Sequence, residues 1–336
     1  MSEIYGLALQ QFALQLGILP DAIMLEQLEL QTATPEQMAW QSGTNSCAIP
    51  TAFFKPYCPD EEHNSRLLGL LEGLFTKMPA RPQQQLVYLL LPEFSGPDNA
   101  QLNALLQQLM RRWPDLLQSE QCRVFPYGSA ASLMAFNAAQ QQLTQQAQMQ
   151  SKARQIWLIA VDTLCSAAAF EHYQAHAGSY VLSEGALAVC LGKAANGLQL
   201  QFSAADANAG QAEHNGDVAI ASLFAQVAQH VQHSGMALNQ LYLPDCGNDN
   251  ASAEWLAQCH KLQGAITLDT AYFLPSYHSG ELGACGGLYR LLHLMQAHQK
   301  GRLTGLTLAY EQSARCYRSV AVFAPANLIQ EQQGSV

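Results

Sequence analysis

Two histidines near the middle of the chain, His172 and His176, lie four residues apart in a stretch with a helical pattern. Residues at this spacing share one face of a helix, so the two imidazoles could bind one metal ion. Glu171 precedes them, but the order is not the His-Glu-x-x-His order of a zinc protease. The pattern therefore favours two exposed helical histidines over a metal site.

Three further potential metal ligands, Cys246, Cys259 and His260, would form a cluster only if the fold brought them together. Buried thiols in an α/β core need no such role, because free cysteine packs as a small hydrophobic residue. His230 and His233 end an amphipathic helical pattern and are expected to be solvated. The glycine-bearing run GACGG lacks the spacing of a phosphate-binding loop. The sequence therefore predicts neither a metal nor a cofactor.

The composition limits the classes of partner. The chain has 336 residues, 49% of them hydrophobic, and a formal net charge of −10. This length suggests one large domain or two ordinary ones. The acidic balance argues against nucleic acid and against an anionic membrane surface, because both require a basic face. No apolar stretch reaches the length of about 18 residues that would indicate a membrane span.

The beginning of the chain and its thiols indicate a compartment. The first residues, MSEIYGLALQQ, include Glu3 and no basic segment, which argues against a secretory signal. The nine cysteines are scattered and form no Cys-x-x-Cys pair. A chain of this size needs no disulfides to hold a core together. We therefore expect reduced thiols and a cytoplasmic protein.

Apolar runs that predict buried strands alternate with helical patterns along most of the chain. The predicted strands are 85–94, 154–162, 186–194, 197–206, 240–245, 266–273, 306–311 and 318–325. The predicted helices are 65–78, 98–118, 129–148, 164–177, 217–234, 251–263 and 283–300. This alternation predicts an α/β fold with largely parallel, buried sheets.

The pattern also repeats coarsely, once over 85–206 and again over 240–325. In each repeat, one helix begins with small residues, near Ser129 and near Gly283. Small residues allow close approach of backbones, so both helices are expected to be buried between sheets. Two similar halves of one α/β unit would explain the length of the chain.

Three segments resemble the β-ketoacyl synthase branch of the thiolase superfamily, and in particular a shortened, degenerate set of bacterial ketosynthase-like proteins. They are VFPYGSAASLMAFNAAQQQL (124–143), the segment 161–194 with its Ser183-Glu184-Gly185-Ala186 run, and PSYHSGELGACGGLYRLLHLMQAHQKG (275–301). The resemblance implies a thiolase-like fold, with two similar α/β halves forming a layered α-β-α-β-α sandwich. We place the N-terminal half at 1–195 and the C-terminal half at 196–336.

Condensation by this family requires a thiolate at a helix N-terminus and two imidazoles that stabilise an enolate. On the matching positions this chain has Ser129 for the nucleophile, Cys246 for the first histidine, and Gly280 or Glu281 for the second. The covering loop of the family, Gly-Phe-Gly-Gly, is replaced by QSARCYRSV (312–320). All the reactive groups that the family uses are therefore substituted.

Two hypotheses remain for this region. A serine acyltransferase would use Ser129 as the nucleophile, with His278 or Glu281 as the base. The alternative, which we favour, is a retired catalytic site in a retained fold. Glu281 is then expected to cap the N-terminus of the helix that follows it. Glu184 is expected to be a buried or turn carboxylate that accepts backbone hydrogen bonds.

The function that we expect is that of a catalytically inactive scaffold, adaptor or accessory subunit, which the resemblance also connects with type VI secretion and a secreted effector. The alternative is a partner resembling a chain length factor, which would shape the acyl tunnel of an active ketosynthase in fatty acid or polyketide synthesis. The resemblance implies a homodimer, or a heterodimer with a ketosynthase-like protein, that pairs through an edge strand of the N-terminal half. An acyl carrier protein is a further expected partner.

Overall fold

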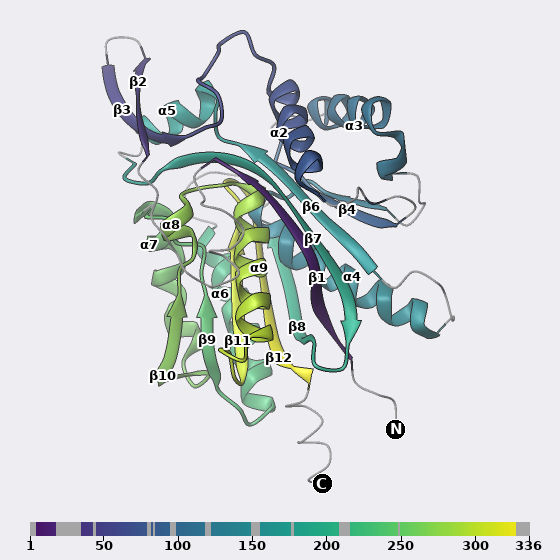
Figure 1. Ribbon diagram of the computed structural model, residues 1–336. Coiled ribbons are helices and arrows are strands. Elements are labelled where there is room, and N and C mark those ends of the chain that lie inside the picture. The colour runs from purple at the N-terminus through teal and green to yellow at the C-terminus, as the bar shows by residue number, and fades with distance from the viewer. Residues whose placement is uncertain are drawn as a thin grey trace.

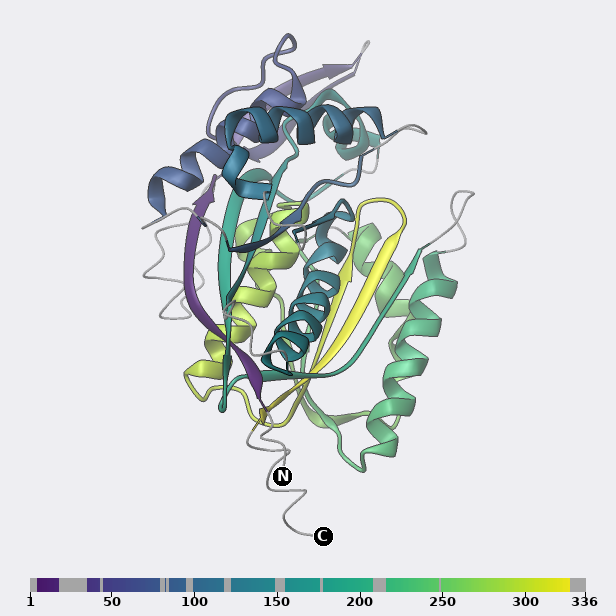
Figure 2. The same ribbon diagram turned by 90° about the vertical axis from the view of Figure 1, so that its right-hand side faces the viewer.

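The computed structural model describes residues 5–17, 35–42, 45–78, 82, 85–94, 99–117, 122–148, 155–175, 178–207, 216–247 and 249–326. They form a mixed α/β fold built on one large, strongly twisted sheet (Figure 1). Two half-sheets make up this sheet, with helices between them and on their outer faces (Figure 2). The α/β fold class expected from the sequence is confirmed.

The N-terminal half-sheet has the order β5-β4-β6-β7-β1. Its strands are β1 (Gly6–Leu16), β4 (Leu86–Leu90), β5 (Arg123–Phe125), β6 (Gln155–Thr163) and β7 (Leu182–Ala194). A separate hairpin of β2 (Glu36–Ser42) and β3 (Asn45–Ala52) joins β7 through two residues of β3.

The C-terminal half-sheet has the order β10-β9-β11-β12-β8. Its strands are β8 (Leu198–Ala207), β9 (Leu238–Tyr242), β10 (Ile266–Phe273), β11 (Leu306–Gln312) and β12 (Tyr317–Pro325). The two half-sheets meet where Leu7 of β1 pairs with Leu198 of β8. The division of the chain at 195/196, between β7 and β8, stays a prediction.

The expectation of a largely parallel sheet is wrong. The strand β7 pairs antiparallel with both β1 and β6, and β12 pairs antiparallel with both β8 and β11. Parallel pairs link β4 with β5 and β6, and β9 with β10 and β11. A strand that is buried on both faces has a continuous apolar run in either kind of sheet, so the run alone could not distinguish them.

The helices form three layers around the half-sheets. The helices α2 (His63–Lys77) and α3 (Ala100–Arg112) cover the outer face of the N-terminal half-sheet, and α6 (Gly216–His233) and α7 (Asp249–Gln258) cover that of the C-terminal one. Between the half-sheets lie α4 (Ala131–Gln148) and α9 (Ala284–Gln299), which contact each other. Two short helices, α5 (Ala167–Ala175) and α8 (Ser276–Ser279), follow β6 and β10. Figure 1 shows α9 between the two half-sheets.

Burial follows from this layering. Along β4, Leu86, Tyr88 and Leu90 join the central core, whereas Val87 and Leu89 join the core beneath α2 and α3. All residues of α9 from Ala284 to Ala297 are buried, as expected for a helix that begins with small residues. Each helix in the described part of the chain is too short or too polar to cross a lipid bilayer.

Candidate functional site

Ser129 lies in the turn between β5 and α4. A short 3-10 turn, Gly128–Ala130, leads directly into α4, and only 4% of the surface of Ser129 is exposed. Its Oγ donates a hydrogen bond to the carbonyl oxygen of Gln312, at 2.5 Å. A carbonyl oxygen cannot remove the proton of a hydroxyl as a general base would. The hydroxyl is therefore held in a structural bond between the turn that precedes α4 and the end of β11.

The hairpin turn between β11 and β12 lies against this serine. Glu93, which follows β4, holds the turn: its Oε2 accepts hydrogen bonds from Ser313 Oγ at 2.6 Å and from the Arg315 amide at 3.1 Å. Its Oε1 accepts bonds from the amide and the thiol of Cys316, at 3.1 and 2.8 Å. Burial, together with Glu93, raises the pKa of the Cys316 thiol to about 11, so this thiol stays protonated near neutral pH.

Gly280 has no space for a side chain. Its φ of +70° favours glycine, and a Cβ atom there would lie 2.6 Å from the carbonyl oxygen of Val181. The next residue, Glu281, is fixed to β7 because its amide donates to Val181 O and its carbonyl accepts from the Ser183 amide. An imidazole at position 280 would therefore require a different backbone.

Cys246 and Glu281 contact each other. The Cys246 thiol donates to Glu281 Oε2 at 3.4 Å, and Glu281 Oε1 accepts from the Gly283 amide at 2.8 Å. The carboxylate thus lies at the start of α9, as expected from the sequence. His278 lies in α8 and is partly buried, with its ring 6.3 Å from that of Tyr277. The structure thus brings Cys246 and Glu281 together, and the Ser129 hydroxyl has a different partner.

Asp162, at the end of β6, is a buried residue of this region that no sequence motif indicated. Its Oδ2 accepts from the amide of Ala284, the first residue of α9, and its Oδ1 from the Thr163 amide, both at 2.7 Å. Burial raises the pKa of Asp162 to about 7, although both amides favour the charged form. A Cβ atom on Gly283 would lie 2.1 Å from Asp162 Oδ2, so this cap requires glycine.

A buried ion pair lies deeper in the same region. Arg290 of α9 donates through Nε to Glu311 Oε1 at 2.8 Å, and its other nitrogens bond Glu311 Oε2 and Ser276 Oγ. Both partners are at most 3% exposed. Burial raises the pKa of Glu311, whereas Arg290 acts in the opposite direction. This pair could not be recognised from the sequence, because its two members lie on different elements.

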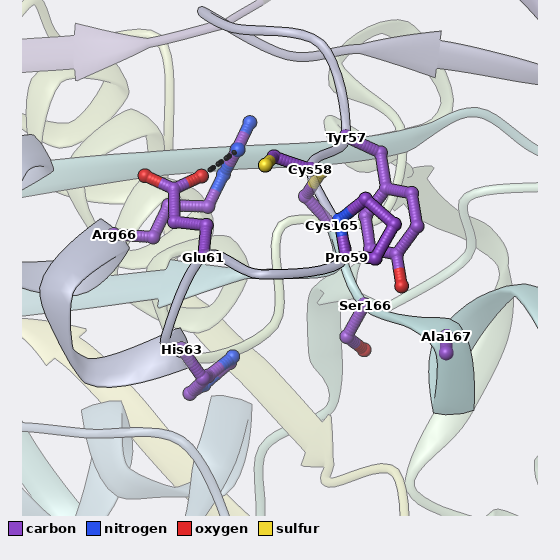
Figure 3. A pocket seen from close by; sticks show the side chains of 9 residues that line it. All are labelled: Tyr57, Cys58, Pro59, Glu61, His63, Arg66, Cys165, Ser166 and Ala167. Atoms are coloured by element: carbon purple, nitrogen blue, oxygen red, sulfur yellow. Dashed lines mark hydrogen bonds and ion pairs between the residues drawn. The ribbon is translucent and has the colours of Figure 1, made fainter.

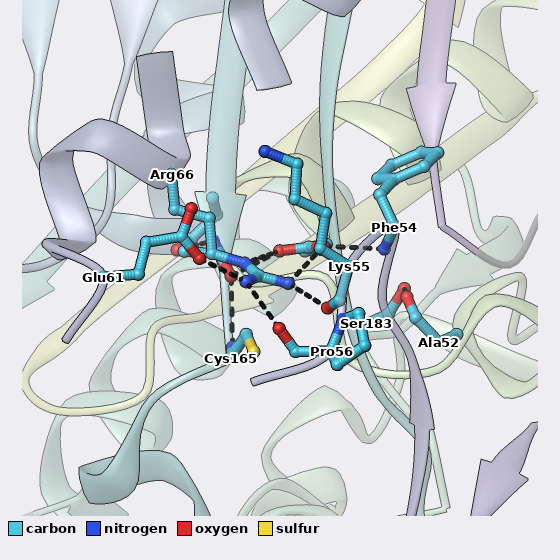
Figure 4. A network of polar contacts seen from close by, with 11 residues as sticks. Ala52, Phe54, Lys55, Pro56, Glu61, Arg66, Cys165 and Ser183 are labelled. Atoms are coloured by element: carbon cyan, nitrogen blue, oxygen red, sulfur yellow. Dashed lines mark hydrogen bonds and ion pairs between the residues drawn. The ribbon is translucent and has the colours of Figure 1, made fainter. Parts of the chain in front are cut away.

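Glu184 belongs to a second buried network, shown in Figure 4. Its carboxylate accepts from Arg66 Nε and an Arg66 terminal nitrogen at 2.6 and 2.9 Å, from Thr163 Oγ1 at 2.7 Å, and from the Phe54 amide at 2.8 Å. Arg66 also pairs with Glu61 at 2.7 Å. The expected buried carboxylate with a backbone partner is confirmed. Its main partner, Arg66, could not be recognised from the sequence.

A small cavity of about 110 Å³ lies at the outer end of this network (Figure 3). It is lined by Tyr57, Cys58, Pro59, Glu61, His63, Arg66, Cys165, Ser166 and Ala167. Burial and the nearby Arg66 lower the pKa of His63, and burial raises that of Cys165 to about 12. A drug-sized ligand needs about 300 Å³ or more, and a protonated thiol is a poor nucleophile. The cavity fits a few water molecules.

The histidines first considered for metal binding lie apart from this region. His172 is exposed, and His176 lies outside the described residues. His230 stacks on Phe202, so it is partly buried rather than fully solvated, whereas His233 is exposed. His260 Nδ1 lies 2.9 Å from the carbonyl oxygen of Ala257. In the part of the chain that the structure describes, no group of three or more His, Cys, Asp or Glu side chains could hold a metal ion.

Solved structures establish the fold. The chain is similar to the ketosynthase from module 6 of the bacillaene synthase of Bacillus subtilis 168, at a TM-score of 0.64 and 10% identity over 95% of this chain and 72% of that one. It is also similar to a type II PKS ketosynthase in complex with its acyl-carrier protein. The TM-score is 0.59 and the identity is 10%, over 96% of this chain and 99% of that one. The chain has a thiolase-like ketosynthase fold. A third similar structure is the ishigamide ketosynthase/chain length factor. Its TM-score is 0.56 and its identity is 14%, over 95% of this chain and 99% of that one.

No family model and no curated protein matches the chain. The ketosynthase fold thus persists at an identity of 9–14% to the matched structures. On this fold, Ser129 lies in the turn that leads into the central helix of the N-terminal half, whereas Glu281 and Asp162 lie at the start of the central helix of the other half. The side chains at the start of both central helices are therefore engaged in structural hydrogen bonds.

Proposed function

We propose that this chain is a catalytically inactive accessory subunit that acts through protein contacts on a ketosynthase fold. One observation carries the proposal: the Ser129 hydroxyl, at the position where the resemblance places the nucleophile, donates to the Gln312 carbonyl. A serine must lose its proton to a base before it can attack a thioester. Its observed partner cannot accept that proton.

The surroundings of Ser129 support the same conclusion. The hairpin turn that replaces the family's covering loop is held by four hydrogen bonds to Glu93. Gly280 leaves no room for an imidazole, and the Glu281 carboxylate already has two partners. Ser129, Glu281 and the hairpin turn, which occupy the places of nucleophile, base and covering loop in the resemblance, therefore all make structural contacts.

The partners that we propose are a second subunit and an acyl carrier protein. Among the similar structures, one contains a type II PKS acyl-carrier protein in complex with its ketosynthase, which supports the second partner. The second subunit would be a copy of this chain or a ketosynthase-like protein. A cytoplasmic location and an adaptor role toward a secreted effector belong to the same proposal.

Acyl transfer tests the absence of catalysis. The purified chain and its Ser129→Ala variant are incubated with acyl-phosphopantetheine thioesters, and the intact masses are measured after denaturation. We expect no acyl adduct on either protein, while a cysteine-bearing ketosynthase in parallel is labelled. An adduct that forms on the wild type and disappears in Ser129→Ala would identify a serine acyltransferase and refute the proposal.

A chain-length-factor-like role is the second candidate, because the ishigamide ketosynthase/chain length factor is among the similar structures. Such a subunit copurifies with a cysteine-bearing ketosynthase and changes the length of its products. A pull-down from the native host, analysed by mass spectrometry, distinguishes the candidates. Recovery of a ketosynthase favours the tunnel-shaping role, and recovery of other proteins without one favours the adaptor.

A further inference from the structure

Two thiols line the small cavity of Figure 3, and they differ in how far solvent reaches them. Cys58, in the segment between β3 and α2, is exposed, whereas Cys165, in the turn between β6 and α5, is 7% exposed. All nine cysteines of the chain lie in its described part, and Cys58 is the one that is exposed. The cavity thus places a thiol that a reagent in solution can reach beside one that it cannot reach.

One buried ion pair holds both sides of the cavity in place. A terminal nitrogen of Arg66 donates to the carbonyl oxygen of Lys55 at 2.6 Å, three residues before Cys58. The Cys165 amide donates to Thr163 Oγ1 at 3.1 Å, and this hydroxyl donates at 2.7 Å to the carboxylate that pairs with Arg66. Both thiol-bearing segments are therefore fastened to the same pair, on either side of a space of about 110 Å³.

The segment that contains Cys58 is the side of the cavity that can move. A disulfide requires the Cα atoms of its two cysteines to lie about 4.4–6.8 Å apart. A space that fits a few water molecules is closed by a small shift of one wall. The segment around Cys58 can make that shift without displacing a buried side chain, because it exposes Phe54, Lys55, Pro56, Pro59 and Asp60.

The cavity also contains an imidazole, which could suggest a nucleophilic cysteine with a histidine base. Figure 3 shows His63 on the opposite side of the cavity from Cys58 and Cys165. The ring of His63 lies 6.4 Å from that of Phe94, measured between centroids. Among the described residues that line the cavity, no imidazole therefore partners either thiol as it would in a cysteine hydrolase. Thiol–disulfide exchange needs only an accessible thiol and a second thiol nearby.

We propose that Cys58 and Cys165 form a reversible disulfide across this cavity, with a low-molecular-weight disulfide such as oxidised glutathione as the oxidant. The bond would fasten the exposed segment between β3 and α2 to the turn between β6 and α5. The inference goes beyond the proposed subunit role and does not depend on it.

The reaction takes two exchanges. The Cys58 thiolate attacks one sulfur of the oxidant, whose S–S bond breaks, and one glutathione thiol leaves with the proton that Cys58 has lost. The sulfur of Cys165 then attacks that of Cys58, and the second glutathione thiol leaves with the proton of Cys165. Two protein thiols are oxidised, and one glutathione disulfide is reduced to two thiols. Burial raises the pKa of Cys165 to about 12, whereas Arg66 acts in the opposite direction, so the second exchange is the slower step.

Disulfide mapping tests the pair. The purified wild type is incubated with oxidised glutathione, free thiols are blocked with N-ethylmaleimide, and the unreduced peptides are identified by mass spectrometry. Cys58→Ser and Cys165→Ser each remove one partner. Cys259→Ser is the matched control, because Cys259 is partly exposed but does not line the cavity.

We expect the wild type and Cys259→Ser to give a linked peptide pair that contains Cys58 and Cys165 and that a reductant separates. In Cys165→Ser, glutathione should remain on Cys58 at an occupancy about tenfold higher than in the wild type, because the resolving thiol is missing. In Cys58→Ser, Cys165 should stay reduced.

The wild-type map decides the outcome even if a variant folds poorly. Glutathione retained on Cys58, a link between other cysteines, or a Cys58 that stays reduced would each overturn the proposal. Ser129 is unchanged in all four proteins, so failure here leaves the acyl-transfer test of the proposed function unaffected.

Discussion

Gly287 is the position where the two central helices allow no added atom. A Cβ atom there would lie 2.1 Å from the carbonyl oxygen of Ser129, 2.8 Å from Ser132 Oγ and 2.9 Å from the Ser129 carbonyl carbon. The closest of these atoms belong to the backbone, so they cannot move away as the end of a flexible side chain would. A Gly287→Ala substitution must therefore shift α9 away from the turn at Ser129.

The expected free-energy change has two parts. Overpacking of a close-packed interior costs about 1–3 kcal/mol and occasionally more. Replacing a helical glycine by alanine returns about 1 kcal/mol. The added Cβ would clash with backbone atoms, so we expect a cost of about 3 kcal/mol, at the upper end of the range for overpacking. After the gain in helix propensity is subtracted, the free energy of unfolding should fall by about 2 kcal/mol.

Gly69 in α2 provides the matched control. This glycine is exposed, and a Cβ atom there would meet nothing within 4 Å. Gly69→Ala should therefore stabilise the protein by about 0.5–1 kcal/mol through helix propensity alone. Urea unfolding followed by circular dichroism measures both variants against the wild type. If Gly287→Ala unfolds at the same or a higher urea concentration than the wild type, the close approach of α9 to Ser129 is wrong.

Two further predictions concern carboxylates around this site. Burial raises the pKa of Asp162 to about 7 in the folded state, above its ordinary value of 3.8, so its contribution to stability is complete below about pH 4 and is lost as pH rises through 7. The difference between the unfolding free energies of wild type and Asp162→Asn should thus fall by up to about 4 kcal/mol between pH 4 and pH 7.5, and a difference independent of pH would contradict the raised pKa. Glu93→Ala removes the acceptor of the Arg315 and Cys316 amides, so both amides should exchange hydrogen about tenfold faster. Unchanged exchange of these two amides, measured by NMR or mass spectrometry, would show that Glu93 does not hold the hairpin.

Much of the layered architecture could be predicted from periodicity. The apolar run near Leu86 and the small residues before Ala131 and Ala284 mark a doubly buried strand and two central helices, and the structure has all three. Strand direction could not be predicted, because β7 is buried on both faces and the middle of its sequence, residues 186–191, is uniformly apolar. Whether a strand runs parallel or antiparallel to its neighbours depends on how the folded chain connects them, and a local residue pattern does not specify this.

The candidate site could be predicted only in part. The positions Ser129 and Glu281 are visible as motifs, but the partner of the Ser129 hydroxyl is a backbone carbonyl 183 residues away. Arg66 and Glu184 likewise lie 118 residues apart. Such contacts depend on which elements the fold brings together, and no local pattern of residue types encodes that choice.

The burial of α9 also determines when this protein can finish folding during its synthesis. The strands β1, β6 and β7, which α9 contacts, are complete once Ala194 has been added to the chain. Translation then needs about 5–20 seconds to reach the start of α9, at about 5–20 residues per second. During that interval the inner face of the nascent N-terminal sheet lacks α9 and is covered only in part, by α4, so the growing chain should engage ribosome-associated chaperones until α9 emerges.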